Sequence, residues 1–515
     1  MKQKLFKPFL SRLVIVIFVI LIQVLWFSLA VTKLLAYSTS INMVLTVISI
    51  GALLYIVNKD ENPAYKLAWV IPIALFPVFG GVLYLFYGDK RPTKGMRRRM
   101  DKAAVQLTPL LPDAEPLLEQ IKKEDKAAYG QMKYINDCAG FPAYQNTRST
   151  YFSSGEECFP VLLERLRKAE KFIFLEYFII EEDSRMWTEV LEILKEKAAQ
   201  GVDVRLLYDD MGSVSLLPWQ YYRKLETYGI QCEAFNHVIP VFSVVMNNRD
   251  HRKITVIDGH TGFTGGWNFA DEYINEKERF GYWKDSGVML EGAAVWNLTV
   301  MFLEIWTSLR PGKREDFCNY MPSAGWRTIC TDEQDGWVQP YGDTPLDHES
   351  VSESVYLNMI HAAQDYIYIT TPYLIIDNEM NTALILAAKR GVDVRILTPG
   401  IPDKKYVFWL TQSYYAGLTE GGVKIYEFDP GFVHAKSFVC DDKYAIVGTI
   451  NMDFRSLFLH FECGVWFYRS PVVQEVKKDI LSALTKSTFQ TKDMTQRGVC
   501  KRLTQAVLRV FAPLL

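Results

Sequence analysis

His251-Arg-Lys253-Ile-Thr-Val-Ile-Asp258, followed at residues 265–268 by Gly-Gly-Trp-Asn, is the stretch that decides the fold of this chain, because it occurs twice. The second copy runs His434-Ala-Lys436-Ser-Phe-Val-Cys-Asp441 and continues at residues 448–451 with Gly-Thr-Ile-Asn. The two copies share their intervals from His to Lys, from Lys to Asp, from Asp to Gly and from Gly to Asn. Agreement at five specified positions indicates an internal duplication rather than coincidence.

The residue types in each copy suit a phosphate. On an extended strand, residues two apart point to the same face, so the His and the Lys of one copy can contact one anion. The apolar runs 254–257 and 438–440 predict buried strands, and the Gly-x-x-Asn predicts a tight turn that presents an amide. Burying a lysine without an anion is costly, so Lys253 and Lys436 indicate a site where an imidazole exchanges a covalent bond at phosphorus.

A wider repeat surrounds the two motifs. Residues 172–180, 184–200 and 201–207 predict a strand, a helix and a strand, and residues 366–376, 379–389 and 391–397 repeat this order. Gly-Val-Asp-Val-Arg opens the third element of both sets. Strands that alternate with helices predict an α/β sandwich in each half. We expect a first domain at 151–310, a linker rich in Gly, Pro and Asp at 311–345, and a second domain at 346–490.

The amino-terminal residues 1–90 predict a membrane anchor. An uncharged stretch between Arg12 and Lys33 and the apolar runs 41–57 and 67–88 indicate two or three transmembrane helices. Whether residues 41–57 cross fully stays open. A basic cluster at 90–102 places the following chain on the cytoplasmic side and also suits anionic lipid headgroups. Residues 91–150 read as a basic and polar connector.

The distribution of charge and the spacing of the cysteines limit the classes of function that the chain can have. Residues 1–102 carry 14 Lys/Arg and 4 Asp/Glu, whereas the rest of the chain carries 43 and 55. The motif-bearing part is therefore acidic, which argues against a nucleic-acid groove. The eight cysteines show no CxxC or metal-finger spacing, so we expect a reduced domain that faces the cytosol.

The paired pattern resembles the His-x-Lys-x4-Asp signature of the phospholipase D superfamily. The resemblance implies two duplicated α/β sandwich domains that form one catalytic unit about a pseudo-twofold axis. It also implies a phosphohistidine intermediate, with His251 as the nucleophile and His434 as the acid/base, although the symmetry of the sequence allows the reverse. Asp258 and Asp441 complete the motifs, and at strand ends we expect them to hold turns.

A histidine that attacks phosphorus needs a carboxylate to orient its second nitrogen. Glu462 is the acid that precedes the apolar strand 463–468, and Asp285 holds the matching place in the first half. We expect these two residues to orient the histidines, and Asn268 and Asn451 to support the phosphate. No metal and no other cofactor is predicted.

Over nearly its whole length the chain resembles bacterial cardiolipin synthases of the phospholipase D type. This resemblance rests on the apolar amino terminus, residues 62–69, the Gly-Gly-x-Asn of the first motif and residues 509–515. It implies that a phosphatidyl group passes from one phosphatidylglycerol to another with release of glycerol, at the cell membrane. Anionic lipids are the expected partners, and no oligomeric state is specified.

Other members of the same superfamily are alternatives. A hydrolytic phospholipase D and a phosphatidylserine synthase stay open, whereas the apolar spans and the acidic domains disfavour a nuclease. Two intact motifs disfavour a non-enzymatic membrane scaffold. Residues 491–515 predict an amphipathic helix with Val499, Leu503 and Val507 on one stripe, which either packs on the domain or lies in the membrane interface.

Overall fold

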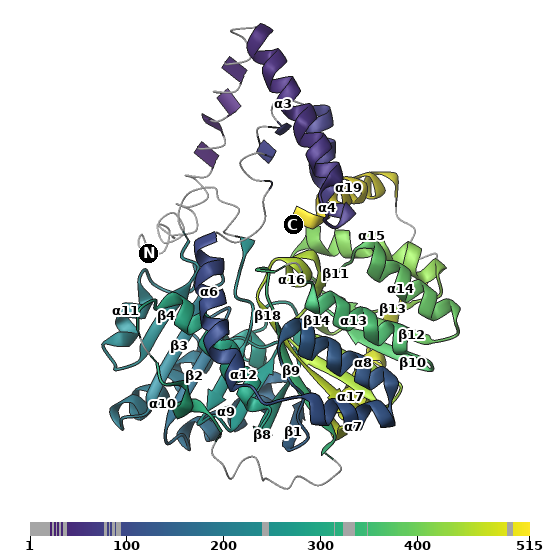
Figure 1. Cartoon of the computed structure of the whole chain (residues 1–515). Helices are drawn as coiled ribbons and strands as arrows, with labels where there is room; N and C mark the ends of the chain where they lie inside the picture. The colour runs from purple at the N-terminus through teal and green to yellow at the C-terminus, as the bar shows by residue number, and fades with distance from the viewer. Residues whose placement is uncertain are drawn as a thin grey trace, which may run out of the picture.

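The fold is described from a computed structural model of the chain (Figure 1). The described residues are 21–22, 25–26, 28–29, 32–33, 39–76, 80–81, 83–84, 88, 94–238, 247–313, 315–322, 335–347, 349–491 and 498–514. Figure 1 shows two α/β halves side by side, with the helices α3, α4 and α19 gathered at one end of the molecule.

The first half is built on a seven-stranded sheet in the order β1-β8-β6-β5-β2-β3-β4. Its strands are β1 (Thr147–Phe152), β2 (Phe172–Tyr177), β3 (Asp203–Asp209), β4 (Gln231–Phe235), β5 (Ile254–Ile257), β6 (Thr261–Gly265) and β8 (Gly287–Gly292). The strands β2, β3 and β4 run parallel, and the other neighbours are antiparallel. The helices of this half are α9 (Gly155–Arg167), α10 (Arg185–Ala199), α11 (Tyr221–Glu226) and α12 (Val295–Leu309).

The second half repeats this sheet. Its order is β19-β13-β12-β10-β15-β16-β18-β9, which matches the first sheet strand for strand once β19 is set aside. The strands are β9 (Trp337–Asp343), β10 (Tyr366–Thr370), β12 (Asp393–Pro399), β13 (Lys424–Phe428), β15 (Ser437–Cys440), β16 (Tyr444–Gly448), β18 (Glu462–Tyr468) and β19 (Ser487–Phe489). The helices are α13 (Val351–Ala362), α14 (Asn378–Lys389), α15 (Lys405–Glu420), α16 (Phe454–Phe458) and α17 (Pro471–Leu484). The matching orders confirm the predicted duplication.

Two details differ from the simple pattern of the sequence. The strand expected at 366–376 is divided into β10 and β11 (Leu374–Ile375), and Pro372, which has no N–H to donate to a ladder, lies in the gap. The strand β9 falls within the stretch 311–345 that was expected to link the domains, and it pairs with β18 along its whole length.

The repeated Gly-Val-Asp-Val-Arg serves the same purpose in both halves. Gly201 and Gly391 follow α10 and α14 with φ angles of 89° and 99°, a region in which a residue without Cβ is unstrained. On the strands that follow, Arg205 and Arg395 each form an ion pair with the Asp two positions earlier, at 2.8 and 2.6 Å. Local backbone geometry therefore explains why this sequence recurs.

The two halves share a continuous core. The helix α12 is buried on nearly all sides and contacts β9 of the second half as well as β5 of its own. Ser286 Oγ lies 2.9 Å from Ser437 Oγ, and Thr264 Oγ1 lies 3.4 Å from Cys463 Sγ. The halves are thus packed as one body, which fixes their motifs relative to each other.

The amino-terminal part supplies the helices α3 (Thr39–Asn58), α4 (Pro63–Leu75) and α6 (Lys94–Leu107). In the part of the chain that the structure describes, no helix combines the length and the apolar character needed to cross a membrane. The expected span between Arg12 and Lys33 lies largely outside the described residues, and so does part of the span at 67–88. The helix α6 buries Met100 and Leu107 and leaves its basic residues 97–99 exposed.

The carboxy-terminal helix α19 (Val499–Phe511) contacts α15 and α4. Gln505 is its buried residue, and its side chain donates to the carbonyl of Trp409 at 2.9 Å. The apolar stripe predicted from the sequence faces outward, with Val499 81%, Leu503 67% and Val507 53% exposed. This helix therefore packs through Gln505 and the partly buried Leu508 and presents the predicted apolar stripe to the surroundings.

Candidate active site

Both His-x-Lys pairs lie immediately before a strand rather than within one. Residues 251–253 precede β5 and residues 434–436 precede β15. Lys253 Nζ donates to the carbonyl of His251 at 2.5 Å, and Lys436 Nζ donates to the carbonyl of His434. Both lysines are at most 1% exposed, so two buried cations lie next to the two histidines.

Each motif histidine is held by a carboxylate from the opposite half. His251 Nδ1 lies 2.9 and 3.0 Å from the two carboxylate oxygens of Glu462. His434 Nδ1 lies 2.7 Å from Asp285 Oδ2. Because a carboxylate only accepts hydrogen bonds, Nδ1 is the donor in both pairs, and the Nε2 lone pair is available to a substrate. Each motif histidine is therefore paired across the junction of the halves.

Two short parallel ladders produce this exchange. The strand β14 (Gly431–Val433) leads into His434 and pairs with β7 (Tyr282–Lys284), which leads into Asp285. Asp250 and Phe461 form the matching parallel bridge, one residue before His251 and Glu462. In both ladders the backbone N–H of the histidine donates to a carbonyl of the opposite half, at 2.9 Å for His251 and 2.7 Å for His434. Parallel register then places histidine and carboxylate side by side.

The carboxylates are fixed by residues that the sequence analysis did not single out. A Cβ on Gly266 would lie 1.9 Å from Asp285 Oδ1, so this glycine leaves the space that the carboxylate fills. In the second motif Thr449 takes the place of Gly266, and its hydroxyl donates to Glu462 Oε2 at 2.5 Å. The signal for both was present in the sequence, where Gly-Gly of the first motif is matched by Gly-Thr of the second.

Each histidine also contacts a ring from the segment that carries its carboxylate. The Trp283 ring centroid lies 5.2 Å from that of His434, and the indole N–H donates to Asp285 Oδ2 at 3.3 Å. His460 is the matching residue of the second half, and its ring centroid lies 5.6 Å from that of His251. The sequence analysis missed His460 because a single histidine outside a motif forms no pattern.

Burial dominates the electrostatics of the site. It lowers the pKa of His251 to about 3 and the pKa of His434 to about 4, against the opposing effect of the paired carboxylates. Burial also lowers the pKa of Lys253 to about 8 and the pKa of Lys436 to about 7. Lys253 is among the charges that lower the pKa of His434, so groups from both halves act on one shared space.

Asp258 and Asp441 are not brought to the histidines. Each follows its strand, seven residues after the histidine, which is roughly 20 Å along an extended chain. Asp258 accepts the backbone N–H groups of Glu170, Lys171 and Phe172 at 2.9, 2.7 and 2.9 Å. Asp441 accepts those of Gln364, Asp365 and Tyr366 at 2.7, 3.0 and 2.8 Å. Both carboxylates hold the backbone at the start of the neighbouring strand.

The two motif asparagines have different surroundings. Asn268 accepts the N–H of Ile179 at 3.0 Å and donates to the hydroxyl of Tyr273 at 2.7 Å, and the Tyr273 ring lies 5.5 Å from His434. Asn451 is 6% exposed, and its Oδ1 has no hydrogen-bond partner. The first amide thus braces the wall of the site, whereas the second keeps an unused acceptor.

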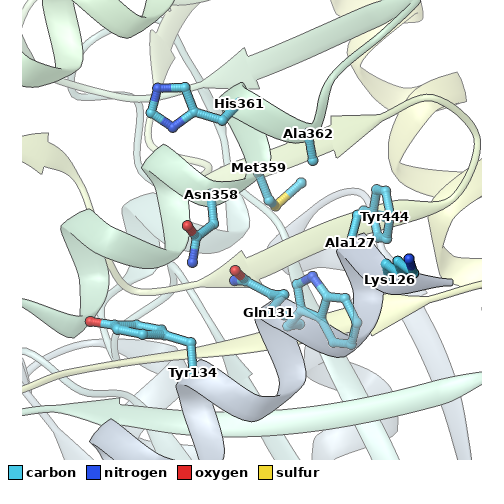
Figure 2. Close-up of a pocket in the computed structure, with 11 residues that line it drawn as sticks. Lys126, Ala127, Gln131, Tyr134, Asn358, Met359, His361, Ala362 and Tyr444 are labelled. Carbon is cyan, nitrogen blue, oxygen red and sulfur yellow. The ribbon is translucent and has the colours of Figure 1, made fainter. Parts of the chain in front are cut away.

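A separate cavity of about 520 Å³ lies between α8 (Lys126–Tyr134) and α13 (Figure 2). Gln131 and Tyr134 from α8 line it together with Asn358 and His361 from α13. None of the residues that line this cavity belongs to a motif. The chemistry of the motifs therefore has its place elsewhere, at the junction of the two halves.

The fold and the two exchanged histidine pairs define a member of the phospholipase D superfamily. The sequence profile described as "Cardiolipin synthase, PLD-like domain" matches residues 162–289 and again 356–484. The profile described as "Phospholipase D-nuclease N-terminal" matches residues 47–88. The chain belongs to the cardiolipin synthase family of this superfamily and is an enzyme of that type.

Several known proteins are similar to this chain. An uncharacterized protein of Streptococcus mutans is 43% identical over 90% of this chain and 100% of its own length. A cardiolipin synthase of Geobacillus kaustophilus is 34% identical over 92% of this chain and 93% of its own. The crystal structure of a phosphatidylserine synthase from Haemophilus influenzae covers 76% of this chain and 98% of that one, with a TM-score of 0.55 and 17% identity. The last likeness shows the fold.

Proposed function

We propose that the chain transfers a phosphatidyl group from one phosphatidylglycerol to the hydroxyl of a second, which yields cardiolipin and glycerol. The observation that carries this proposal is the pair of exchanged histidine–carboxylate contacts beside two buried lysines. Two imidazoles with available Nε2 atoms suit a double displacement at phosphorus, and the lysines offset the charge of the phosphate. No metal or organic cofactor takes part in the proposed chemistry.

In the first step His251 Nε2 attacks the phosphorus of the donor lipid. The N–P bond forms as the bond from phosphorus to the glycerol oxygen breaks, and His434 gives that oxygen a proton. A bound phosphate anion offsets the lysines, which favours the protonated His434 that this step needs.

In the second step His434 takes the proton from a hydroxyl of the acceptor lipid, whose oxygen attacks phosphorus as the N–P bond breaks. One phosphodiester replaces another, so no nucleotide is consumed.

The difference between the halves supports this division of roles. Asp285 contacts one imidazole, that of His434, at 2.7 Å. Glu462 lies near two imidazoles, those of His251 and His460. A positive charge on His434 therefore faces a carboxylate and an indole, whereas the carboxylate of His251 has a second imidazole 3.8 Å away. His434 is accordingly the better carrier of a proton, and His251 is the nucleophile.

We also infer that residues 1–90 anchor the enzyme in the cell membrane through two or three spans, with the catalytic halves in the cytoplasm. The exposed apolar side chains of α3, such as Val47 and Leu54, support this inference. The anchor is joined firmly to the second half, because Asn62 donates to Asp377 at 2.8 Å and the Tyr65 ring packs on α16. The exposed basic residues 97–99 of α6 suit anionic headgroups.

The proposal is tested by incubating the purified full-length protein with labelled phosphatidylglycerol. We expect cardiolipin and glycerol in equal amounts, reversal by excess glycerol, and no product with His251→Ala or His434→Ala. Phosphatidic acid as the main product would indicate the hydrolytic alternative. Strict dependence on CDP-diacylglycerol, with release of CMP, would contradict the proposal. The anchor is tested by washing membranes that contain the protein with carbonate. We expect the protein to stay with the membranes.

A further inference from the structure

His460 is a largely covered imidazole whose two ring nitrogens are buried and have no hydrogen-bond partner. Its side chain is 10% exposed, and neither ring nitrogen is paired. Its Nδ1 lies 3.8 Å from Glu462 Oε1, which is too long for a hydrogen bond. Leaving a buried polar atom unpaired costs about 1–3 kcal/mol. The matching Trp283 of the first half does not carry this cost, because its indole N–H is donated to Asp285.

Three groups that commonly bind metal ions converge at this point. Among the described residues, His251, His460 and Glu462 bring one ligand atom each to within 4.8 Å of one another. The Nδ1 atoms of the two histidines lie 2.9 and 3.8 Å from the same oxygen of Glu462. In a tetrahedral zinc site with bonds of about 2.0–2.1 Å, the ligand atoms are roughly 3.3 Å apart. Because the three ligand atoms lie within 4.8 Å of one another, the most separated pair must approach by at most about 1.5 Å to complete the geometry.

We propose that His251, His460 and Glu462 form an inhibitory site for a divalent transition-metal ion of the zinc type. Two imidazoles and one carboxylate are a ligand set that zinc accepts, and the metal gives His460 the partner it lacks. The carboxylate of Glu462 and the unpaired imidazole of His460 belong to the protein, so the ion can bind when no lipid substrate is present.

Inhibition follows from the position of the proton on His251. Nδ1 of His251 exchanges its hydrogen bond to Glu462 for a bond to the metal. The proton of Nδ1 moves to Nε2, because a neutral imidazole keeps one N–H. Nε2 then lacks the lone pair with which it attacks phosphorus. This effect on activity rests on the proposed function, in which His251 is the nucleophile, whereas the binding of metal does not.

Binding is tested on the full-length protein after treatment with a chelator. We expect titration with Co²⁺ to give one equivalent bound, with the visible absorption of a tetrahedral site, and Zn²⁺ to displace it. X-ray absorption of the zinc form should show nitrogen and oxygen ligands at about 2.0–2.1 Å. Sulfur ligands at about 2.3 Å would place the metal on cysteines and overturn the proposal.

Substitutions test whether His460 is a ligand of the metal. His460→Asn should weaken the binding of Co²⁺ at least about tenfold. His361→Asn, which removes an exposed imidazole on α13, is the matched control and should leave binding unchanged. Equal binding by the wild type and by His460→Asn would refute the site. If His460→Asn does not fold, as judged by thermal melting, His460→Gln and the wild-type absorption spectrum decide.

The effect on activity is measured as cardiolipin formation against Zn²⁺ concentration, with each variant compared with its own metal-free rate. The wild type should lose activity over the range in which it binds zinc and recover on chelation. For His460→Asn the inhibition should need at least about ten times more zinc. Unchanged inhibition of this variant would refute the proposal. A protein that binds Co²⁺ through nitrogen but makes no cardiolipin would instead contradict the proposed function alone.

Discussion

The exchange of carboxylates between the halves predicts that Glu462→Gln and Asp285→Asn slow different steps. Gln at position 462 keeps the size of the side chain but removes the charge that stabilises His251 when its ring becomes positive on attacking phosphorus. Asn at position 285 removes the same support from His434, which carries the proton. Each substitution therefore acts on the histidine of the other half.

The structure sets the size of the effect. With 2.9 Å between His251 Nδ1 and Glu462 Oε1, the charge centres of the two groups are about 4 Å apart. At this separation an effective dielectric constant of about 20 gives an attraction of roughly 4 kcal/mol. Since each 1.36 kcal/mol on a barrier changes a rate about tenfold, Glu462→Gln should slow formation of the phosphohistidine about 10³-fold.

A lipid with a p-nitrophenyl leaving group separates the two steps. Phosphatidyl-p-nitrophenol releases p-nitrophenolate without needing a proton, so a rapid burst of colour reports attack by the nucleophile alone. We expect Asp285→Asn and His434→Ala to keep the burst and to be slow with phosphatidylglycerol as acceptor. Glu462→Gln and His251→Ala should lose the burst.

Two other outcomes carry different meanings. If Glu462→Gln and His251→Ala keep the burst while Asp285→Asn and His434→Ala lose it, the nucleophile is His434 and the exchange of carboxylates stands. If Asp285→Asn behaves like His251→Ala, each histidine uses the carboxylate of its own half. That result would refute the reasoning.

Three further predictions concern charged side chains outside the two histidine pairs. A chelator should leave cardiolipin formation intact, because Lys253 and Lys436 already supply positive charge at the phosphate, and activity that is lost in EDTA and restored by one ion would contradict this. Burial raises the pKa of Glu304 on α12 to about 7 from 4.5, so ionising this acid opposes folding, and stability should fall as the pH rises from 4.5 through 7. Glu304→Gln should therefore raise the free energy of unfolding in urea by up to roughly 3 kcal/mol at pH 8 and little at pH 4.5, whereas equal gains at both would argue against this cause. Asp258→Asn replaces one acceptor of backbone N–H groups by a donor. Calorimetry should show that the free energy of unfolding falls by about 2 kcal/mol. A large decrease in kcat for the folded variant would instead indicate a catalytic role.

The parts of the fold that the sequence predicts are those with local signals. The motif spacing, the apolar runs and the repeated Gly-Val-Asp-Val-Arg each extend over a few residues, so they predict strands and the duplication of the halves without knowledge of tertiary contacts. Glu462 and Asp285 were predicted to orient the histidines from their places relative to the motifs.

The pairing of these residues could not be predicted. His251 and Glu462 are 211 positions apart, and the parallel register that joins them exists only after the halves have packed. The match of Gly-Gly with Gly-Thr marks position 449 in the sequence but does not show that its hydroxyl contacts Glu462, and His460 carries no signal until the two halves are compared in three dimensions. The outward apolar face of α19 was likewise one of two alternatives, because periodicity gives the stripe but not its orientation.

The division of each histidine from its carboxylate has a consequence for the chain during its synthesis. After His251 has been added to the growing chain, another 211 residues must be translated before Glu462 exists, which takes roughly 10–40 s at 5–20 residues per second. Throughout this interval the nascent first half carries a reactive side chain without the group that activates it. Under the proposed mechanism, the unfinished chain lacks both Glu462 and the second motif, so catalysis should begin only after the second half has been translated and has packed on the first.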